Sequence, residues 1–571
     1  MKFEITDDNR PYLEARGRIV LNACPGSGKT SAIAYKLTKI SEECAKLYGS
    51  YAGIACLSFT NVAKDEIADK FQIISNKQLT YPHLNSTIDS FINQYITLPF
   101  YHLFKVHSQR PSILNTVSFL DNMNLGWFKN KRNQPLSVSY PPSKLKFEMD
   151  GSISWDGSVP KPSIVDASEF ERYARKFKKW QYENGYLDND DSIFFAFKLL
   201  EKYPEISKSL VNRFPYIIVD EAQDTSGLQY KIFDKLIDAG LKNFELVGDP
   251  YQSLYEFREA KPALFMSRYE DTSNWQALRF IDCRRSSQKI IDAYSIFRNT
   301  GEASITSTCS HATDHNLKVI RYKETELPAL IDKYKSLINN SGKNFILVRG
   351  STHLQQFGVK TFSENPWKSS LSKMLIDAHI QFSDGNSKAC VDTIRTIFAE
   401  MTISGDYKAK SDEIKRLKDD TASNMVFFDF LLTMPTIDDS LEGWTAKTTM
   451  HIKSKFGLDI DLQLKKKGKV YTAQNLKTLL YPPIETPYPI STIHKVKGMT
   501  FDSVMIVLSK DSKGANFSLN DFRKPQALPD EKQRMLYVAL SRPETLACIA
   551  VPEIFSEEEI RTHLGIDIEF L

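Results

Sequence analysis

The sequence predicts an α/β protein with two parallel-sheet cores, each interrupted by a mainly helical insertion. A glycine-rich loop at residues 23–30 joins an apolar run to a helical pattern, which indicates a strand, a loop and a helix. Further apolar runs form two groups, before residue 275 and after residue 315, and helix-rich stretches interrupt both groups. Because these runs are continuously apolar rather than alternating, they are typical of strands that helices cover on both faces.

The other predicted strands are short apolar runs bounded by turn residues. They lie at residues 54–59, 216–219, 244–247, 318–321, 344–348, 503–508 and 546–551. The expected division assigns 1–94 and 201–275 to the first core, 276–354 and 486–571 to the second core, and 95–200 and 355–485 to the insertions. A hairpin is expected near residues 465–469.

Composition excludes several classes of protein. With 571 residues, the chain is too long for a small binding module, given about 150 residues per domain. Hydrophobic residues at 42% and charged residues at 25% exclude wholesale disorder. The net charge of +4 is too small to indicate a nucleic-acid or membrane partner by itself. Because no apolar stretch reaches about 18 residues, we expect a cytoplasmic protein with no membrane partner.

The cysteines give no sign of a metal site or of a disulfide framework. There are seven of them, and no two have C-x-x-C spacing. An odd number of widely spaced cysteines predicts reduced thiols, most of them buried.

The glycine-rich loop fits the phosphate-binding pattern G-x-x-x-x-G-K-S/T, except that alanine replaces the first glycine. Its members are Ala23, Cys24, Pro25, Gly26, Ser27, Gly28, Lys29 and Thr30. In such loops backbone N–H groups and the lysine hold phosphate oxygens, and the hydroxyl of the last residue contacts Mg²⁺. The alternative is an ordinary glycine-rich turn.

An acidic pair follows the apolar run 216–219 and supplies the second half of such a site. Asp220 is predicted to hold Mg²⁺ together with Thr30, and Glu221 to orient the attacking water as general base. The alternative is a solvated acidic surface. An acidic pair directly after four apolar residues favours the edge of a sheet that faces a metal.

Several segments, in order, resemble the signatures of superfamily 1 helicases of the UvrD/Rep type. The acidic segment 220–224 reads DEAQD, and residues 247–258 read VGDPYQSLYEFR. The others are SFTN at 58–61, STIDSF at 86–91, GYLDNDD at 185–191, CRRSS at 283–287, TIHKVKGMTF at 492–501 and LYVALSR at 536–542. The resemblance spans nearly the whole chain, and it implies two RecA-like cores and ATP-dependent movement on DNA.

The resemblance also implies roles for residues that lie far from the glycine-rich loop in sequence. Gln252 corresponds to a sensor of the γ-phosphate. Arg285 and Arg542 correspond to arginines that contact the phosphates from the second core, with Arg284 as the alternative to Arg285. Such arginines would stabilise transferring charge only when the two cores close.

Short polar and aromatic residues at family positions are the candidates for contacts with DNA. Thr60, Asn61, Thr87 and His494 would touch the strand backbone, and Tyr255, Phe257 and Arg258 would follow the sensor on the DNA side. A base stacks on an aromatic ring and a guanidinium reaches a phosphate, which favours Phe257 as the stacking residue. The alternatives are helix caps for the polar residues and buried core for the rings.

A local excess of positive charge lies in the first insertion. Residues 101–146 hold seven basic residues and one acidic residue, a net charge of +6. Trp127 and Phe128 stand beside several of them. Such a stretch suits a nucleic-acid backbone, and a solvated loop is the alternative.

The sequence departs from the UvrD/Rep pattern at the adenine-recognition position. The family has a glutamine upstream of the phosphate loop, whereas residues 1–50 contain none. Asp8 or Asn9 is the expected substitute, so ATP remains the expected nucleotide.

The leading hypothesis is an ATP- and Mg²⁺-dependent helicase that moves 3′ to 5′ on single-stranded and tailed double-stranded DNA. The compact size resembles short UvrD-like helicases encoded beside a partner nuclease, including the helicase subunits of Gabija-type antiphage defence systems. One alternative is a DNA-end-sensing ATPase that gates such a nuclease with little processive unwinding. Another is a P-loop kinase or transport ATPase, which Gln252 and Arg542 disfavour.

Overall fold

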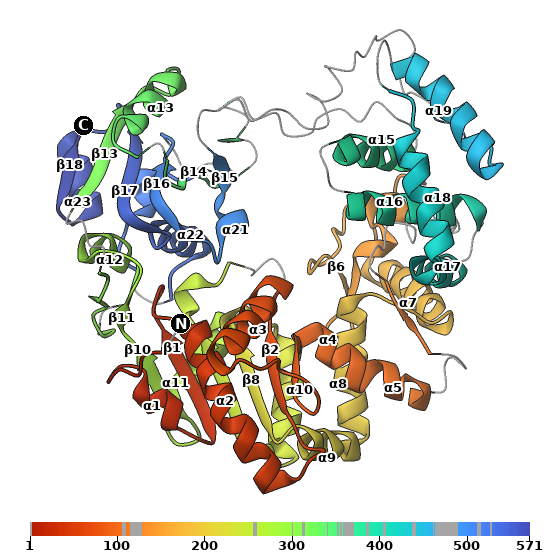
Figure 1. Cartoon of the computed structure of the whole chain (residues 1–571), viewed down its shortest axis with the longest axis horizontal. Coiled ribbons are helices and arrows are strands. Elements are labelled where there is room, and N and C mark those ends of the chain that lie inside the picture. The colour runs from red at the N-terminus through yellow and green to blue at the C-terminus, as the bar shows by residue number, and fades with distance from the viewer. Residues whose placement is uncertain are drawn as a thin grey trace. The chain divides into compact units, whose positions relative to one another are not determined.

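The structure is a computed structural model that falls into two compact units. It describes residues 3–104, 110–114, 128–254, 260–299, 301–310, 315–339, 341–350, 353–354, 357, 370–383, 387–403, 407–436, 441–460, 462, 489–510, 516–525 and 528–571. The first unit comprises Met1–Arg349 and Ser491–Leu571, and the second comprises Gly350–Ile490. Figure 1 follows the chain through both units.

The first sheet of the large unit has six parallel strands in the order β10-β1-β9-β8-β2-β3. Their bounds are β1 Arg18–Ala23, β2 Ile54–Ser58, β3 Leu84–Thr87, β8 Tyr216–Asp220, β9 Asn243–Gly248 and β10 Gln276–Phe280. The carboxyl ends of β1, β8 and β9 are neighbours, so the loops that follow them meet at one edge of the sheet.

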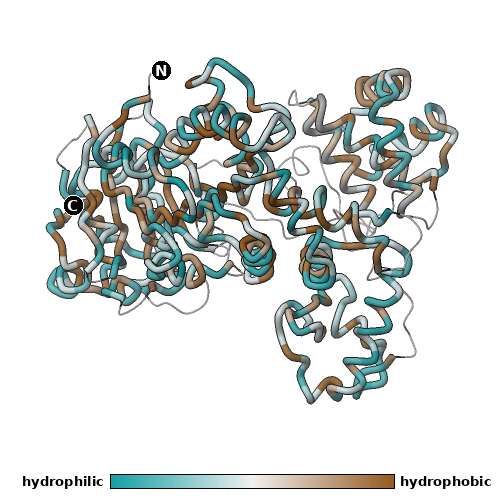
Figure 2. Tube along the Cα trace, turned by 90° about the horizontal axis from the view of Figure 1, so that it is seen from below, coloured by the Kyte–Doolittle hydropathy of each residue, from teal (hydrophilic) through white to brown (hydrophobic). Residues whose placement is uncertain are grey.

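Helices cover both faces of this sheet. In β1, Ile19 and Leu21 pack in one hydrophobic cluster and Val20 in another. The first cluster draws on α2 Lys29–Tyr48 and α3 Asn61–Ser75, and the second on α4 Ile88–Ile92, α8 Asn189–Lys202, α9 Pro204–Arg213 and α10 Gly227–Asp238. Figure 2 shows hydrophobic stretches gathered inside the unit that carries both termini. Burial on both faces explains the continuously apolar strands.

A buried ion pair fixes α2 to the first sheet. Lys36 of α2 and Glu245 of β9 are both essentially inaccessible, and their charged atoms lie 2.8 Å apart. The ammonium of Lys36 also lies 4.1 Å from the ring centroid of Tyr12, in α1 Arg10–Glu14. Since α2 begins at the glycine-rich loop, this pair helps to hold the loop in place.

The second sheet of the large unit has the order β15-β14-β16-β17-β13-β18. Its strands are β13 Leu317–Tyr322, β14 Asn344–Val348, β15 Ile490–Thr492, β16 Phe501–Val507, β17 Pro543–Pro552 and β18 Ile568–Phe570. Helices α12 Gln288–Ser295, α21 Ile493–Val496, α22 Glu531–Leu540 and α23 Glu557–Leu564 pack in its hydrophobic cluster. Cys24, Tyr251 and Leu254 belong to the same cluster, so the two cores share apolar contacts. The predicted fold class is confirmed: α/β, with two large, mainly parallel sheets.

The described residues between β3 and β8 form helices and short strand pairs. Helix α7 Ala167–Glu183 precedes α8, and β5 Leu145–Phe147 pairs antiparallel with β6 Ile153–Trp155 around the turn at Asp150 and Gly151. A second pair joins β4 Ser112–Ile113 to β7 Tyr186–Leu187. Lys178 of α7 is buried and bonds Asp191 of α8 at 2.7 Å, which ties these two helices together.

The second unit is helical in its described part. Its helices are α15 Ser370–Ser383, α16 Ser387–Thr402, α17 Tyr407–Asp419, α18 Thr421–Leu432 and α19 Leu441–Phe456. They pack around Trp444, Phe427 and Phe430. The hairpin expected near residues 465–469 lies outside the described residues.

All seven cysteines are free thiols, and all but the partly exposed Cys309 are buried. Within the described ranges, no helix is both long and apolar enough to cross a bilayer.

Candidate active site between the two cores

The glycine-rich loop forms the expected turn between β1 and α2. Gly26 and Gly28 have φ angles of 72° and 84°, a region that glycine enters without strain. The Ser27 hydroxyl donates to the Cys24 carbonyl at 2.8 Å and closes the loop. Gly28 is the N-cap of α2 and has no side chain to bond the first-turn N–H groups. These donors and the positive end of the helix dipole therefore suit a phosphate.

Gly26 also lies directly against the first strand-and-turn segment of the second core. The Arg284 N–H donates to the Gly26 carbonyl at 3.0 Å. A Cβ atom at Gly26 would lie 2.6 Å from the Arg285 Cβ and 3.1 Å from the Cys283 Sγ. Only glycine fits where the loop and this segment approach so closely.

Gly26→Ala is therefore expected to cost more stability than Gly28→Ala. Both substitutions force alanine into the left-handed region, at about 1–2 kcal/mol each, but a Cβ at Gly28 meets no atom within 4 Å. Overpacking should add about 1–3 kcal/mol at Gly26. Thermal unfolding of the nucleotide-free variants measures the difference. Equal unfolding midpoints for the two variants would show that the segment at Arg285 does not press on the loop.

The acidic turn that follows β8 places two carboxylates at the same edge of the sheet. Asp220 is buried and accepts a hydrogen bond from the Glu221 N–H at 2.9 Å. Glu221 has a φ of 53°, an unusual conformation for a residue with a side chain. Its carboxylate accepts a 2.5 Å hydrogen bond from the Gln223 amide. The turn thus holds Glu221 in one orientation.

The electrostatics of the two carboxylates differ. Burial raises the pKa of Asp220, and the neighbouring Glu221 raises it further. Burial also acts to raise the pKa of Glu221, but the nearby Lys29 and Lys497 outweigh it, so that pKa is lowered. Asp220 thus lies where a cation would be stabilising, and Glu221 is held ionised.

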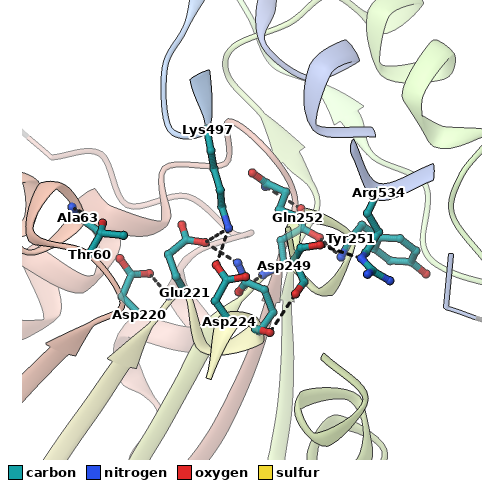
Figure 3. A network of polar contacts seen from close by, with 12 residues as sticks. Thr60, Ala63, Asp220, Glu221, Asp224, Asp249, Tyr251, Gln252, Lys497 and Arg534 are labelled. Atoms are coloured by element: carbon teal, nitrogen blue, oxygen red, sulfur yellow. Dashed lines mark hydrogen bonds and ion pairs between the residues drawn. The ribbon is translucent and has the colours of Figure 1, made fainter. Parts of the chain in front are cut away.

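Gln252 is where the two cores meet in this site (Figure 3). It lies in the short helix η6 Pro250–Gln252 after β9, and its amide donates to Asp249 at 2.8 Å. Arg542 lies between α22 and β17 in the second core, and it donates to the Gln252 side-chain oxygen at 2.9 Å. The hydroxyl of Tyr537, also from α22, bonds Asp249 at 3.3 Å.

Arg285 and Arg542 lie next to each other. Arg542 is buried, and Arg285 donates to the carbonyl of Ser541 at 3.1 Å. Burial lowers the pKa of Arg542 to about 9, with a further contribution from Arg285. Two neighbouring guanidinium groups are costly without an anion, and phosphate oxygens would relieve the repulsion. Arg284 is exposed and contributes its backbone to the contact with Gly26.

The candidate DNA-contacting residues divide into three groups. Thr60 and Thr87 are the N-caps of α3 and α4, and each accepts a bond of 3.2 Å from a first-turn N–H. Asn61 is exposed, and His494 on α21 is partly buried. Tyr255, Phe257 and Arg258 lie outside the described residues. Thr60 follows β2 and Thr87 ends the adjacent strand β3, so both lie at the edge of the sheet that carries Asp220.

The charge excess of residues 101–146 is partly neutralised by acids that lie later in the same insertion. Lys131 pairs with Asp166 at 2.7 Å, Lys144 with Asp156 at 3.1 Å and Lys146 with Asp190 at 2.9 Å. The count of +6 therefore overstates the local field. Trp127 lies outside the described residues.

Asp8 and Asn9, the expected substitutes for the adenine-binding glutamine, hold the backbone. Asp8 accepts from the Ile281 N–H at 2.9 Å. Asn9 is buried and bonds the backbone of Thr6 and Glu4, each at 3.0 Å. These bonds position the segment before β1.

Sequence reasoning assigned no role to several residues that complete the network. Lys497 contacts Asp224, and Arg534 donates to the Ser253 carbonyl at 2.8 Å. Gln223 bonds both Glu221 and the Asp249 N–H. Lys497 lies inside a segment that resembles a family signature, but spacing alone gives no partner for its side chain.

The fold and this site define a P-loop protein with two RecA-like cores. Residues 6–273 match the family described as the UvrD/REP helicase N-terminal domain. This match confirms the resemblance to superfamily 1 helicases of the UvrD/Rep type that the motifs show.

Curated relatives agree with this family. A probable DNA helicase II homolog of Mycoplasma capricolum is 25% identical over 60% of this chain and 48% of its own length. The ATP-dependent DNA helicase Rep of Buchnera aphidicola is 26% identical over 48% of this chain and 41% of its own. The ATP-dependent DNA helicase PcrA of Staphylococcus aureus is 26% identical over 52% of this chain and 40% of its own length. The chain thus spans less than half the length of these relatives.

Proposed function

We propose that this chain is an ATP-dependent DNA helicase that couples ATP hydrolysis between its two cores to movement along single-stranded DNA. The relatives named as ATP-dependent DNA helicases support the class of activity. The observation that carries the proposal is the 2.9 Å bond between Arg542 and Gln252. It joins the second core to the first beside the glycine-rich loop and the acidic turn, so that hydrolysis and core movement can drive each other.

The proposed catalytic roles follow from these positions. The backbone of loop 23–30 and Lys29 bind the phosphates, and Glu221 orients a water and takes up its proton. Gln252 contacts the γ-phosphate and reports its presence to Arg542. Arg285 and Arg542 stabilise the charge that develops on the transferred group, because both guanidinium groups come from the opposing core.

Asp220 and Thr30 are the proposed ligands of Mg²⁺. The donor set fits this ion, since a carboxylate and a hydroxyl are hard oxygen ligands and magnesium sites commonly use one or two carboxylates with substrate phosphates. The buried carboxylate of Asp220, whose pKa is raised, also favours a cation. When bound, the ion would neutralise phosphate charge.

DNA is proposed to contact Thr60, Asn61 and Thr87 at the edge of the first sheet and His494 on α21 of the second core. Tyr255, Phe257 and Arg258 are proposed to contact bases and phosphates. Contacts to the strand backbone and stacking on base faces bind DNA without sequence preference. We also propose the division into cores and insertions expected from the sequence, with 95–200 and 355–485 as accessory segments, except that β10 Gln276–Phe280 belongs to the sheet of the first core.

The direct test is unwinding of duplexes with a 3′ tail, a 5′ tail or no tail, in the presence of ATP and Mg²⁺. We expect displacement of the 3′-tailed duplex. Three-prime-to-5′ movement, a partner nuclease encoded nearby and a role in antiphage defence are the finer parts of this proposal. ATP hydrolysis without displacement of any tailed duplex would instead favour a DNA-end-sensing ATPase that gates the nuclease.

Phe257→Ala is expected to separate hydrolysis from movement. Stacking of a base on an aromatic ring is worth about 1–3 kcal/mol, so strand displacement should fall by about tenfold or more while most ATP hydrolysis persists. The same tailed duplex reports displacement, and phosphate release reports hydrolysis. Tyr51→Ala, which removes a ring that is 78% exposed, is the matched control. An equal loss of both activities would make Phe257 a structural residue.

A further inference from the structure

Lys497 connects the second core to the acidic turn of the first. It follows α21, and its ammonium contacts the Asp224 carboxylate and lies 4.0 Å from that of Glu221. Figure 3 shows the side chain extending toward both carboxylates. Asp224 is 1% exposed, and the Lys497 side chain is 11% exposed. The contact is thus screened from solvent and not a surface ion pair.

The acidic turn transmits this contact to the proposed general base. The Asp224 N–H donates to the Glu221 carbonyl at 2.9 Å, and Gln223, between them, bonds the Glu221 carboxylate. A displacement of Lys497 therefore changes both the charge beside Glu221 and the anchor of the turn that orients it. A buried carboxylate such as Asp224 is costly without a cation in contact with it. A movement of Lys497 would therefore move Asp224 and the acidic turn with it.

Lys497 also lies beside the candidate DNA contact of the second core. His494 is three residues earlier, on the one-turn helix α21, which begins where β15 ends. A strand that contacts His494 and shifts α21 would shift Lys497 with it, because so short a helix moves as one piece. The segment from His494 to Lys497 thus lies beside both the candidate DNA contact and the acidic turn after β8.

We propose that Lys497 is the positioning residue through which single-stranded DNA bound to the second core sets the orientation of Glu221 and so stimulates ATP hydrolysis. This inference rests on the proposed function. Lys497 is not proposed to touch the reacting atoms. It acts through Asp224 and the acidic turn that carries Glu221. Its removal should therefore reduce the response to DNA more than the hydrolysis that occurs without DNA.

The experiment compares the ATP turnover of the full chain with and without an oligothymidylate strand. Lys497→Met should lower the ratio of stimulated to basal kcat by about tenfold, the size of a typical coupling between sites, with little change in the KM for ATP. Lys497→Arg keeps a cation and should recover most of the ratio. Lys495→Met removes an exposed lysine two residues away and should leave the ratio unchanged.

A second variant tests whether the contact with Asp224 carries the effect. Asp224→Asn should lower the ratio as Lys497→Met does, and the double variant should lose no more than either single one, as expected for residues that act as a unit. Thermal unfolding identifies any variant that fails to fold. If one of Lys497→Met and Asp224→Asn does not fold, the ratio of stimulated to basal kcat is taken from the other.

Three results would overturn the proposal: full stimulation in Lys497→Met, multiplicative losses in the double variant, or equal losses of basal and stimulated turnover. If the wild-type chain hydrolyses no ATP on single-stranded DNA, the proposed function itself has failed, and this outcome is distinct from the three.

Discussion

Arg542→Gln is expected to lower ATP turnover on single-stranded DNA by about 10³–10⁵-fold, the effect of removing an arginine that stabilises transferring phosphate charge. Its guanidinium is buried at the junction of the cores and bonds Gln252 at 2.9 Å. Phosphate release at saturating ATP measures kcat, and a fluorescent nucleotide measures binding. Binding should change far less than kcat, because the arginine is proposed to act on charge that shifts towards the leaving oxygen only in the transition state.

Because Arg542 is buried, its replacement also affects stability, and the controls separate the two effects. Loss of a hydrogen-bonding partner in the interior costs about 1–3 kcal/mol, which thermal unfolding would report. Arg542→Lys keeps the charge but not the planar fork, so its turnover should lie between wild type and Arg542→Gln. Arg523→Gln removes an exposed arginine before α22 and should have no effect. Near-wild-type turnover in a folded Arg542→Gln would contradict the assignment.

Glu221→Gln is expected to reduce the same turnover by about 10²–10⁴-fold, the usual contribution of a general base. The amide has nearly the same shape as the carboxylate but cannot take up a proton from water. Nucleotide binding should persist, because the glycine-rich loop and Lys29 are unchanged. Single-turnover hydrolysis and nucleotide binding, measured on the same preparation, separate chemistry from affinity.

Glu42→Gln is the matched control for this substitution, because Glu42 is an exposed glutamate on α2. It should retain full turnover. If Glu221→Gln also retained turnover close to that of the wild-type chain, another group would have to be the base, and the acidic turn would serve only to bind a cation.

The sequence was sufficient to predict the buried strands but not the edges of the sheets. The apolar runs of β8, β9 and β17 stand out because both faces are covered. Strand β3 reads LNST and β10 reads QALRF, and β10 has two exposed residues. Edge strands tolerate polar side chains, so their patterns resemble those of loops.

The site was predictable where a motif is local, and it was not where two distant segments meet. The spacing around Lys29 and the acidic pair at Asp220 carry their own signal. The partners of Lys497 and Arg534 are 273 and 281 residues away in sequence. No local pattern encodes such a contact, because it depends on how the two cores pack.

The most direct test of the central claim is the ATP turnover of the wild-type chain as a function of single-stranded DNA concentration. Lys29→Ala provides the background, since it lacks the cation that reaches the phosphates. For a motor whose cores close on ATP and DNA together, we predict saturable stimulation of about tenfold or more, with a blunt duplex stimulating much less. Turnover that is the same with and without single-stranded DNA would contradict the account.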